Sequence, residues 1–169
     1  MKTKLHTIHL KSGCASYGTT SNSFFTTNGI GKGGTIQKGA VRVDYLTSTD
    51  QDAQYGPGGA GHFVKVKCPS IPFTDLAIRC DDSSTIKRVS LPDQTVGVCM
   101  NQSTETSGGN QHFSYQNNNT SRDDNSGREF MNFNTANPLN IVLTDISDDA
   151  IDIPDWRLGL TFIEFIDEE

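Results

Sequence analysis

The sequence predicts a single domain built from antiparallel β-strands, and three observations lead to this fold class. The chain has 169 residues, which is the size of one domain with a core of its own. Apolar and polar residues alternate in short segments, and no long segment repeats with the period of a helix. Turns rich in glycine, proline and asparagine separate nearly all of these segments. Two half-buried sheets must cover each other's apolar faces, so the expected fold is an all-β antiparallel sandwich.

The alternation is clearest in two of the predicted strands. In segment 36–46, Val41, Val43 and Tyr45 share one face while Arg42 and Asp44 point the other way. In segment 62–68, Val64 and Val66 alternate in the same manner with lysines. About eight core strands with one or two extra strands would form a jelly roll. The predicted strands are 4–10, 36–46, 62–68, 75–80, 85–91, 95–100, 111–115, 128–133, 139–144 and 157–165.

Residues 1–169 are predicted to form one domain, because the chain has no internal repeat and no interdomain linker. Its core is expected to be anchored by the apolar residues that alternate inward along these strands. These anchors are Val41, Val43, Val64, Val66, Ile141, Leu143, Trp156, Leu158, Leu160 and Phe162.

A polar loop insertion around 101–127 stands apart from this pattern. It consists almost wholly of Asn, Gln, Ser, Thr, Gly and Asp, apart from the short strand predicted inside it. Such a loop cannot offset its own ordering entropy by burial, so we expect a partner or solvent to meet it. The same expectation holds for loop 47–61. The residues of these loops that are expected to face partners are Tyr55, His112 and Tyr115.

Charge and hydropathy disfavour two classes of partner. The formal net charge is -6 and no run of basic residues is present, so no nucleic-acid surface is expected. No apolar run is long enough to span a bilayer, and residues 1–10 lack the apolar stretch of a signal peptide. Synthesis in the cytoplasm, a reducing compartment, is therefore expected.

No catalytic residue and no cofactor site is predicted. The sequence has no Gly-x-Ser-x-Gly nucleophile elbow. The glycine-rich segments 29–34 and 56–61 lack the Gly-Lys-Ser/Thr ending of a phosphate-binding loop, so hairpin turns explain them better. The chain is therefore expected not to be an enzyme.

Metal ligation is not favoured either. His6 and His9 are three residues apart on a predicted strand and so point to opposite faces. Oxygen ligands in Asp123, Asp124 and Asn125 make a weak calcium candidate, and segment 145–149 makes another, but a solvated acidic turn explains both better because the EF-hand spacing is absent. Cys68, Cys80 and Cys99 follow apolar strand residues, which favours buried free thiols over zinc ligands or disulfides; Cys14 is the fourth cysteine.

The two ends of the chain resemble a known family. The first end has a strand at Leu5–Leu10, a Ser/Thr-rich link that holds Phe24 and Phe25, and the segment 39–46. The second runs from Asn137 through Thr144-Asp145 and an acidic turn to a final strand that starts at Trp156. This arrangement is similar to the single-jelly-roll minor capsid and penton proteins of large double-stranded DNA viruses, including virophages, Polinton-like viruses and algal giant viruses. The middle, residues 47–136, has no match.

The resemblance implies a structural protein of the virion, a penton or cement-like subunit that assembles by protein–protein contacts. Its implied partners are the major capsid protein, other minor capsid proteins and further copies of itself, and its location is the virion. A carbohydrate-binding sandwich, such as a lectin-like module or the head of a spike, is the alternative. In that case the aromatic and amide side chains of the long loops would contact a sugar.

Overall fold

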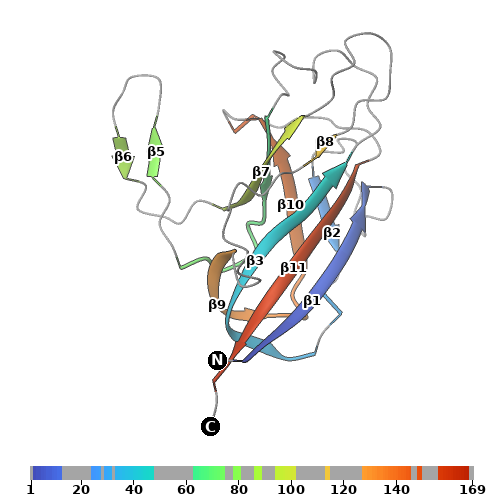
Figure 1. Ribbon diagram of the computed structural model, residues 1–169, viewed down its shortest axis with the longest axis vertical. Helices are drawn as coiled ribbons and strands as arrows, with labels where there is room; N and C mark the ends of the chain where they lie inside the picture. The colour runs from blue at the N-terminus through green and yellow to red at the C-terminus, as the bar shows by residue number, and fades with distance from the viewer. Residues whose placement is uncertain are drawn as a thin grey trace.

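A computed structural model shows a β-protein whose strands form two main sheets (Figure 1). It describes residues 2–12, 24–27, 29–31, 33–47, 63–74, 78–80, 86–88, 94–101, 113–114, 127–145, 148–149 and 156–167. Among these residues there is no α-helix, and hence none long and apolar enough to cross a membrane. The all-β prediction is confirmed. The strands are β1 (Lys2–Lys11), β2 (Phe24–Thr27), β3 (Thr35–Thr47), β4 (Phe63–Lys67), β5 (Ile78–Cys80), β6 (Ile86–Arg88), β7 (Thr95–Asn101), β8 (Phe113–Ser114), β9 (Arg128–Asn134), β10 (Leu139–Thr144) and β11 (Arg157–Ile166).

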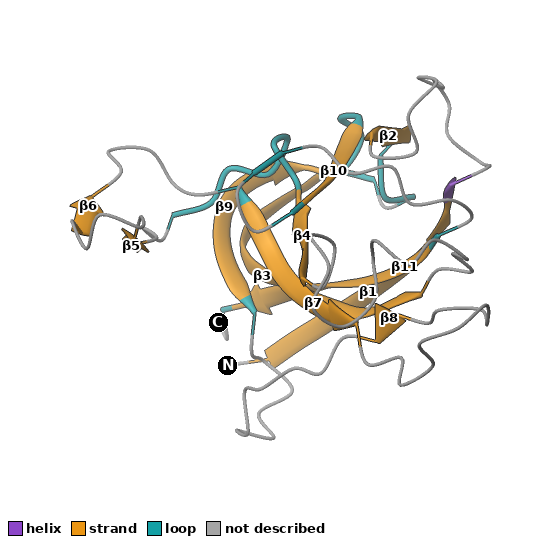
Figure 2. Cartoon of the chain, turned by 90° about the horizontal axis from the view of Figure 1, so that it is seen from above, coloured by secondary structure: helices purple, strands orange, loops and turns teal. Residues whose placement is uncertain are grey.

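The two sheets are antiparallel throughout, and each joins strands that are far apart in the sequence. The four-stranded sheet has the order β1-β11-β3-β9, and the five-stranded sheet has the order β2-β10-β4-β7-β8. Seen from above, the sheets face each other across the interior (Figure 2). The hairpin β5-β6 pairs only with itself among the described strands and stands clear of both sheets in Figures 1 and 2.

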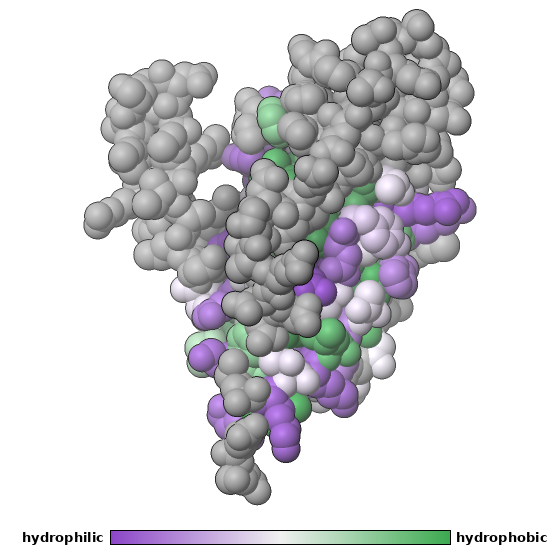
Figure 3. Space-filling view, viewed as in Figure 1, coloured by the Kyte–Doolittle hydropathy of each residue, from purple (hydrophilic) through white to green (hydrophobic). Residues whose placement is uncertain are grey.

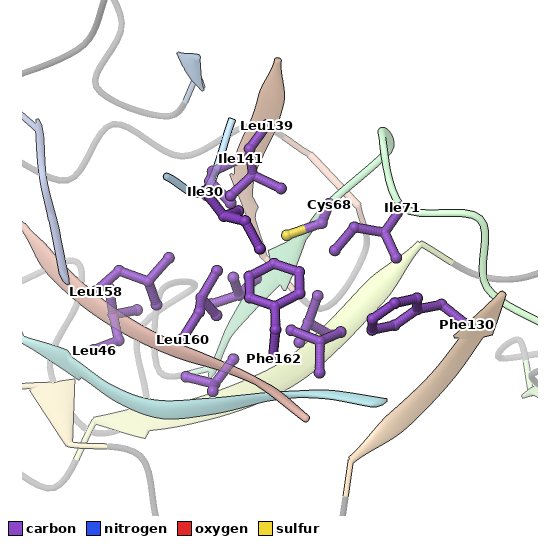
Figure 4. Packing of buried hydrophobic residues seen from close by; sticks show 14 of the residues in the cluster. Ile30, Leu46, Cys68, Ile71, Phe130, Leu139, Ile141, Leu158, Leu160 and Phe162 are labelled. Atoms are coloured by element: carbon purple, nitrogen blue, oxygen red, sulfur yellow. The ribbon is translucent and has the colours of Figure 1, made fainter. Parts of the chain in front are cut away.

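The core fills the space between the two sheets. Figure 4 shows the Phe162 side chain of β11 pointing across this space toward Cys68 and Ile141 on the other sheet. All ten residues that the sequence predicts as core anchors are exposed by 2% or less. They are joined there by residues that the prediction did not include, namely Ile30, Ile36, Leu46, Cys68, Ile71, Phe73, Val96, Cys99, Phe130, Phe133 and Leu139.

Three phenylalanines form the centre of the core at the β9 end. The rings of Phe133 and Phe162 are stacked with centroids 5.5 Å apart, and Phe130 meets both of them edge-on. Phe130 and Phe133 are three residues apart on one strand, so regular alternation would place them on opposite faces. Between them Asn132 has a φ of 55°, a left-handed conformation that asparagine tolerates better than most residues. This irregularity accompanies the burial of both rings.

One predicted connection is wrong. The Ser/Thr-rich link that holds Phe24 and Phe25 contains a strand, β2, which pairs with β10 from Thr27 opposite Leu139 to Phe24 opposite Val142. Only four residues form this strand, and its neighbours in the sequence are polar. Its extended conformation is explained by pairing with a distant strand, because the local sequence carries no alternation.

The loop before β3 is fixed to the turn after β9 by one buried threonine. Thr135 donates hydrogen bonds from its backbone N–H and its hydroxyl to the carbonyl of Gly34, at 3.0 and 2.7 Å, and its own carbonyl accepts from Ile30. Gly29 has a φ of 68°, and a Cβ at this position would lie 2.4 Å from the Thr135 carbonyl oxygen. Glycine is therefore required there by both conformation and space.

The β9 margin of the four-stranded sheet is covered. Segment 72–74 runs along it, with Met131 N–H donating to the Pro72 carbonyl and Thr74 N–H donating to Glu129. The Arg128 guanidinium lies 4.2 Å from the centroid of the Phe73 ring and donates to the Thr95 carbonyl of the other sheet at 2.7 Å. This margin is thereby joined to the five-stranded sheet.

Candidate functional site on the outer face of the four-stranded sheet

The outer face of the four-stranded sheet carries the largest group of interacting polar side chains that the structure describes. β11 lies in the middle of this sheet, between β1 and β3. Two of its outward residues are buried although they point away from the core, namely Thr161 at 2% and Ile163 at 0% exposure. The centre of this face is therefore packed, and not a simple solvated surface.

A chain of hydrogen bonds crosses three strands on this face. The Thr161 hydroxyl donates to Asp44 Oδ2 at 2.5 Å and lies 3.0 Å from the Thr7 hydroxyl. An ionised carboxylate only accepts, so Thr161 uses its single proton on Asp44 and must accept from Thr7. Arg42 Nε donates to the other carboxylate oxygen of Asp44 at 3.0 Å. The four side chains thus connect β1, β11 and β3, and Asp44 accepts at the point where the donors from Thr161 and Arg42 meet.

A bulge in β3 lies at Asp44. The register of β3 on β11 runs from Val43 opposite Leu160 to Tyr45 opposite Gly159, which leaves Asp44 as an extra residue without a partner. Such an extra residue bends the strand and redirects a side chain. Arg42 and Asp44 share the outer face, as regular alternation predicts. The bulge turns Tyr45 outward as well, so its predicted place on the face of Val43 is wrong, while Val43 and Leu46 both remain buried.

An aromatic pair lies next to the bulge. His9 and Tyr45 stand on either side of Gly159 in the register, and their rings stack with centroids 5.8 Å apart. His9 Nδ1 and the Tyr45 hydroxyl are 2.8 Å apart. A Cβ on Gly159 would lie 2.4 Å from Tyr45 Cε1, so the ring crosses the space that a side chain would occupy. Glycine at this position is what lets β3 reach β1 over the intervening strand.

Nearer the other end of β1, a second histidine contacts the neighbouring strand β11. His6 Nε2 lies 2.9 Å from Glu164 Oε2, with both side chains largely buried. The register places His6 opposite Phe162 and His9 opposite Gly159, on opposite faces of the strand as the sequence predicts. The two histidines have separate partners and do not converge.

Five large apolar side chains described on the two main sheets are exposed. Figure 3 shows hydrophobic and hydrophilic residues interleaved over the described part of the viewed face. Exposed apolar residues are common on protein surfaces, so they do not by themselves define a pocket. The large ones are Leu5 at 51%, Met131 at 47%, Ile166 at 41%, Phe63 at 39% and Val98 at 38% exposure.

The polar groups at the centre of this face are occupied by one another. Thr161 is buried, and the Asp44 carboxylate already accepts two hydrogen bonds, so neither is poised to act on a substrate. Within the described ranges, no group of three or more His, Cys, Asp or Glu residues could hold a metal. Cys68 and Cys99 are buried free cysteines, and burial raises the pKa of both thiols well above the ordinary value. These two thiols are held in the neutral form that is a poor nucleophile.

The five-stranded sheet carries a separate ion-pair group on its outer face. Asp148 contacts Nζ of Lys65 at 2.9 Å and Nζ of Lys67 at 2.5 Å. Partial burial raises the pKa of Asp148, but hydrogen bonds and charge from Lys67 and Lys65 outweigh it and lower the pKa below its ordinary value. The carboxylate of Asp148 in this acidic turn is thus occupied by two lysines.

Most of the predicted site residues lie outside the residues that the structure describes. These are Tyr55, His112, Tyr115, Asp123, Asp124 and Asn125, together with Cys14. Of the predicted polar loop, only residue 101, segment 113–114 and Gly127 are described. The outer-face group of Thr7, Arg42, Asp44 and Thr161 was not predicted, because Thr7 and Thr161 meet across 154 positions of sequence. The single local signal was the pairing of Arg42 with Asp44 on one face of a predicted strand.

No family model, no curated protein and no solved structure matches the chain.

Proposed function

We propose that the chain is a single jelly roll that acts as a structural subunit of a viral shell, in a penton or cement-like position. One observation carries the fold part of this proposal. Numbered from one to eight in chain order, β1, β2, β3, β4, β7, β9, β10 and β11 follow the orders 1-8-3-6 and 2-7-4-5 in the two sheets. Two interlocked Greek keys, the plan of a jelly roll, produce this alternation between sheets. β8 extends one margin, and β5-β6 is an inserted hairpin.

The resemblance of the two chain ends to minor capsid proteins gains support from their place in the fold. Its residues fall largely on β1, β3, β10 and β11. Three of these strands, β1, β11 and β3, are neighbours in one sheet. The first and last parts of the sequence thus form one continuous surface, which is the kind of surface that a shell subunit uses against its neighbours.

A binding role also agrees with the chemistry of the described surface. The polar side chains of the outer face bond to one another, and Cys68 and Cys99 are buried. A protein with such a surface would act by contact with other proteins. A closed ring of subunits multiplies each contact by symmetry, so modest interfaces suffice.

The state of assembly of the purified chain tests this function. We expect sedimentation velocity and mass photometry over a wide range of concentrations to show a homo-oligomer of fixed size, and electron microscopy to show closed rings. Two variants, Leu5→Ser and Val98→Ser, each remove one exposed apolar side chain from a different sheet and serve as a matched pair. If only one of the two variants weakens the oligomer, the sheet that carries that residue forms the contact between subunits.

The same preparation tests the carbohydrate-binding alternative. The residues on which that alternative depends, Tyr55, His112 and Tyr115, lie outside the described residues, so assembly is the function proposed. A chain that stays monomeric at every concentration and binds sugars on a glycan array would contradict the shell role. An array without signal, together with a defined oligomer, would support it.

A further inference from the structure

Among the strands that the structure describes, none pairs with the outer margin of β1. β1 is a ten-residue strand that pairs with β11 on one side only, and Figure 1 shows no described strand beyond it. Every second residue of such a strand directs its backbone N–H and C=O away from its one neighbour. Apart from the pairing with β11, no backbone hydrogen bond within the described part of the chain involves residues 2–11. A row of backbone donors and acceptors is thus available along this margin.

The charge of β1 is opposite to that of the whole chain. The strand contains Lys2, Lys4, Lys11, His6 and His9 and has no acidic residue, whereas the protein carries a net charge of -6. All three lysines are exposed, and none forms an ion pair with another described residue. The open margin is therefore a basic strip on an acidic protein.

Pairing of this margin with a second copy of itself is disfavoured by the same charges. A second copy would bring three more lysines and no acidic residue to the same margin. Two strips of like charge repel each other when they are brought side by side. Lysines on an edge strand are also a common device against edge-to-edge aggregation.

We propose that the β1 margin binds an acidic, extended segment of a partner protein, which adds to the four-stranded sheet as a fifth strand. The side chains of β1 define the sequence of that segment. Lys2 and Lys4 lie on the face of the sheet that continues into Ile8 and Leu10, both half-buried against the core. An antiparallel segment would thus place apolar residues first, opposite Leu10 and Ile8, and acidic residues last, opposite Lys4 and Lys2. On the other face, exposed Leu5 would take an apolar residue.

This inference concerns the sheet edge alone and does not depend on the capsid role. Backbone hydrogen bonds would provide affinity, and the charged and apolar side chains would fix register and direction. Oligomer size reports on the proposed function, whereas peptide binding reports on this edge, so the failure of one is distinguishable from the failure of the other.

A synthetic peptide tests the inference directly. The sequence Glu-Val-Thr-Ile-Thr-Glu-Val-Glu-Thr-Glu has the length of β1 and matches its side chains in the antiparallel register. Calorimetry should show binding to the full-length protein, and hydrogen exchange should show protection of alternate amides within residues 2–11. A peptide with every Glu replaced by Lys should not bind.

Two further probes separate strand addition from simple charge attraction. Two versions of the peptide are N-methylated at alternate residues, one at the odd and the other at the even positions. The version whose methyl groups replace the N–H groups that face β1 should not bind, and the other version should bind normally. The variant Lys2→Glu/Lys4→Glu/Lys11→Glu should bind the acidic peptide about tenfold or more weakly, since three cross-strand charge pairs change from attraction to repulsion. The matched control Lys38→Glu alters an exposed lysine of β3 and should bind normally.

Absence of binding by the acidic peptide would overturn the proposal. Binding of both N-methylated versions without protection of β1 amides would also overturn it, because only surface charge would then be involved. A concentration-dependent protection of β1 without any peptide would show that a second copy occupies the edge, which contradicts the stated occupant.

Discussion

The two margins of the four-stranded sheet are built in opposite ways. The β9 margin is covered by segment 72–74 and fixed to the second sheet by Arg128, which contacts both Phe73 and the Thr95 carbonyl. The β1 margin has no described strand beyond it and presents exposed lysines. One margin is closed by the chain itself, and the other is open and charged.

The difference shows how a sandwich can leave one specific edge available for binding. A sheet edge with no cover risks uncontrolled pairing, and proteins counter this risk either by covering the edge or by charging it. Here each margin uses a different one of these two devices. The outer-face contacts of Thr7 with Thr161 and of His9 with Tyr45 keep β1 attached to the sheet while its far side remains open.

The largest expected effect comes from the covered margin. Phe130→Ala removes a fully buried ring that packs on Phe133 and Phe162, so the free energy of unfolding should fall by about 3–5 kcal/mol. Leu5→Ala, the matched truncation on the open margin, affects a side chain that is 51% exposed and should change it by about 0.5 kcal/mol or less. Urea denaturation measures both. Equal losses would contradict the distinction between the margins.

A smaller effect is expected where β1 is tied to the sheet. Gly159→Ala would place a Cβ 2.4 Å from the Tyr45 ring, which must move and give up its stacking on His9. Overpacking of this kind costs about 1–3 kcal/mol. Tyr45→Leu/Gly159→Ala relieves the crowding, so the double variant should be more stable than the sum of the two single changes predicts. If thermal unfolding showed that the stability changes of the two single variants add up in the double variant, this account of Gly159 would be contradicted.

The Arg128 contact that fixes the covered margin should contribute about 1–2 kcal/mol to the free energy of unfolding. Arg128→Ala removes a charged donor from the Thr95 carbonyl and a cation from the Phe73 ring. Hydrogen exchange of the Met131 and Thr74 amides should accelerate in this variant, because segment 72–74 would open more often. Arg128→Lys keeps the charge and should retain part of the protection. Unchanged exchange in Arg128→Ala would show that backbone bonds alone hold this margin.

The smallest effect concerns the charged contact of the other sheet. The pKa of Asp148 is lowered in the folded protein, so its contribution to stability is present above the ordinary value near 3.8 and is lost as the pH falls through the folded pKa. Asp148→Asn should cost about 0.2–1 kcal/mol at neutral pH, the range of partly exposed ion pairs, and should flatten the loss of stability in acid. Asp149→Asn, an exposed neighbour, is the control. Identical acid profiles for both variants would contradict the role given to Lys65 and Lys67.

Most of the strand architecture could be predicted from the sequence, because alternation follows from the geometry of a half-buried strand. The segments around Val41, Val64, Ile141 and Leu160 place apolar residues inward at every second position, and the structure buries them. β2 was missed because four residues without alternation carry no such signal. Its partner β10 lies more than a hundred positions further along the chain.

The candidate surface could not be predicted in the same way. Its contacts depend on which strands become neighbours, and a local pattern does not contain that information. Thr7 meets Thr161 and His6 meets Glu164 only because the first and last strands pair. The joint burial of Phe130 and Phe133 depends on an irregular residue, Asn132, that the period-two rule does not foresee.

The extra residue in β3 makes the length of that strand as important as its composition. Asp44 has no partner on β11, so every later residue of β3 faces the side that it would not face in an uninterrupted strand. Deleting Asp44 would remove the bulge and leave Val43, Tyr45 and Leu46 in regular alternation opposite Leu160, Gly159 and Leu158, so Leu46 would stay in the core. A deletion scan along residues 40–47 should therefore be tolerated best at position 44, where the loss is limited to the hydrogen bonds of Asp44 with Thr161 and Arg42.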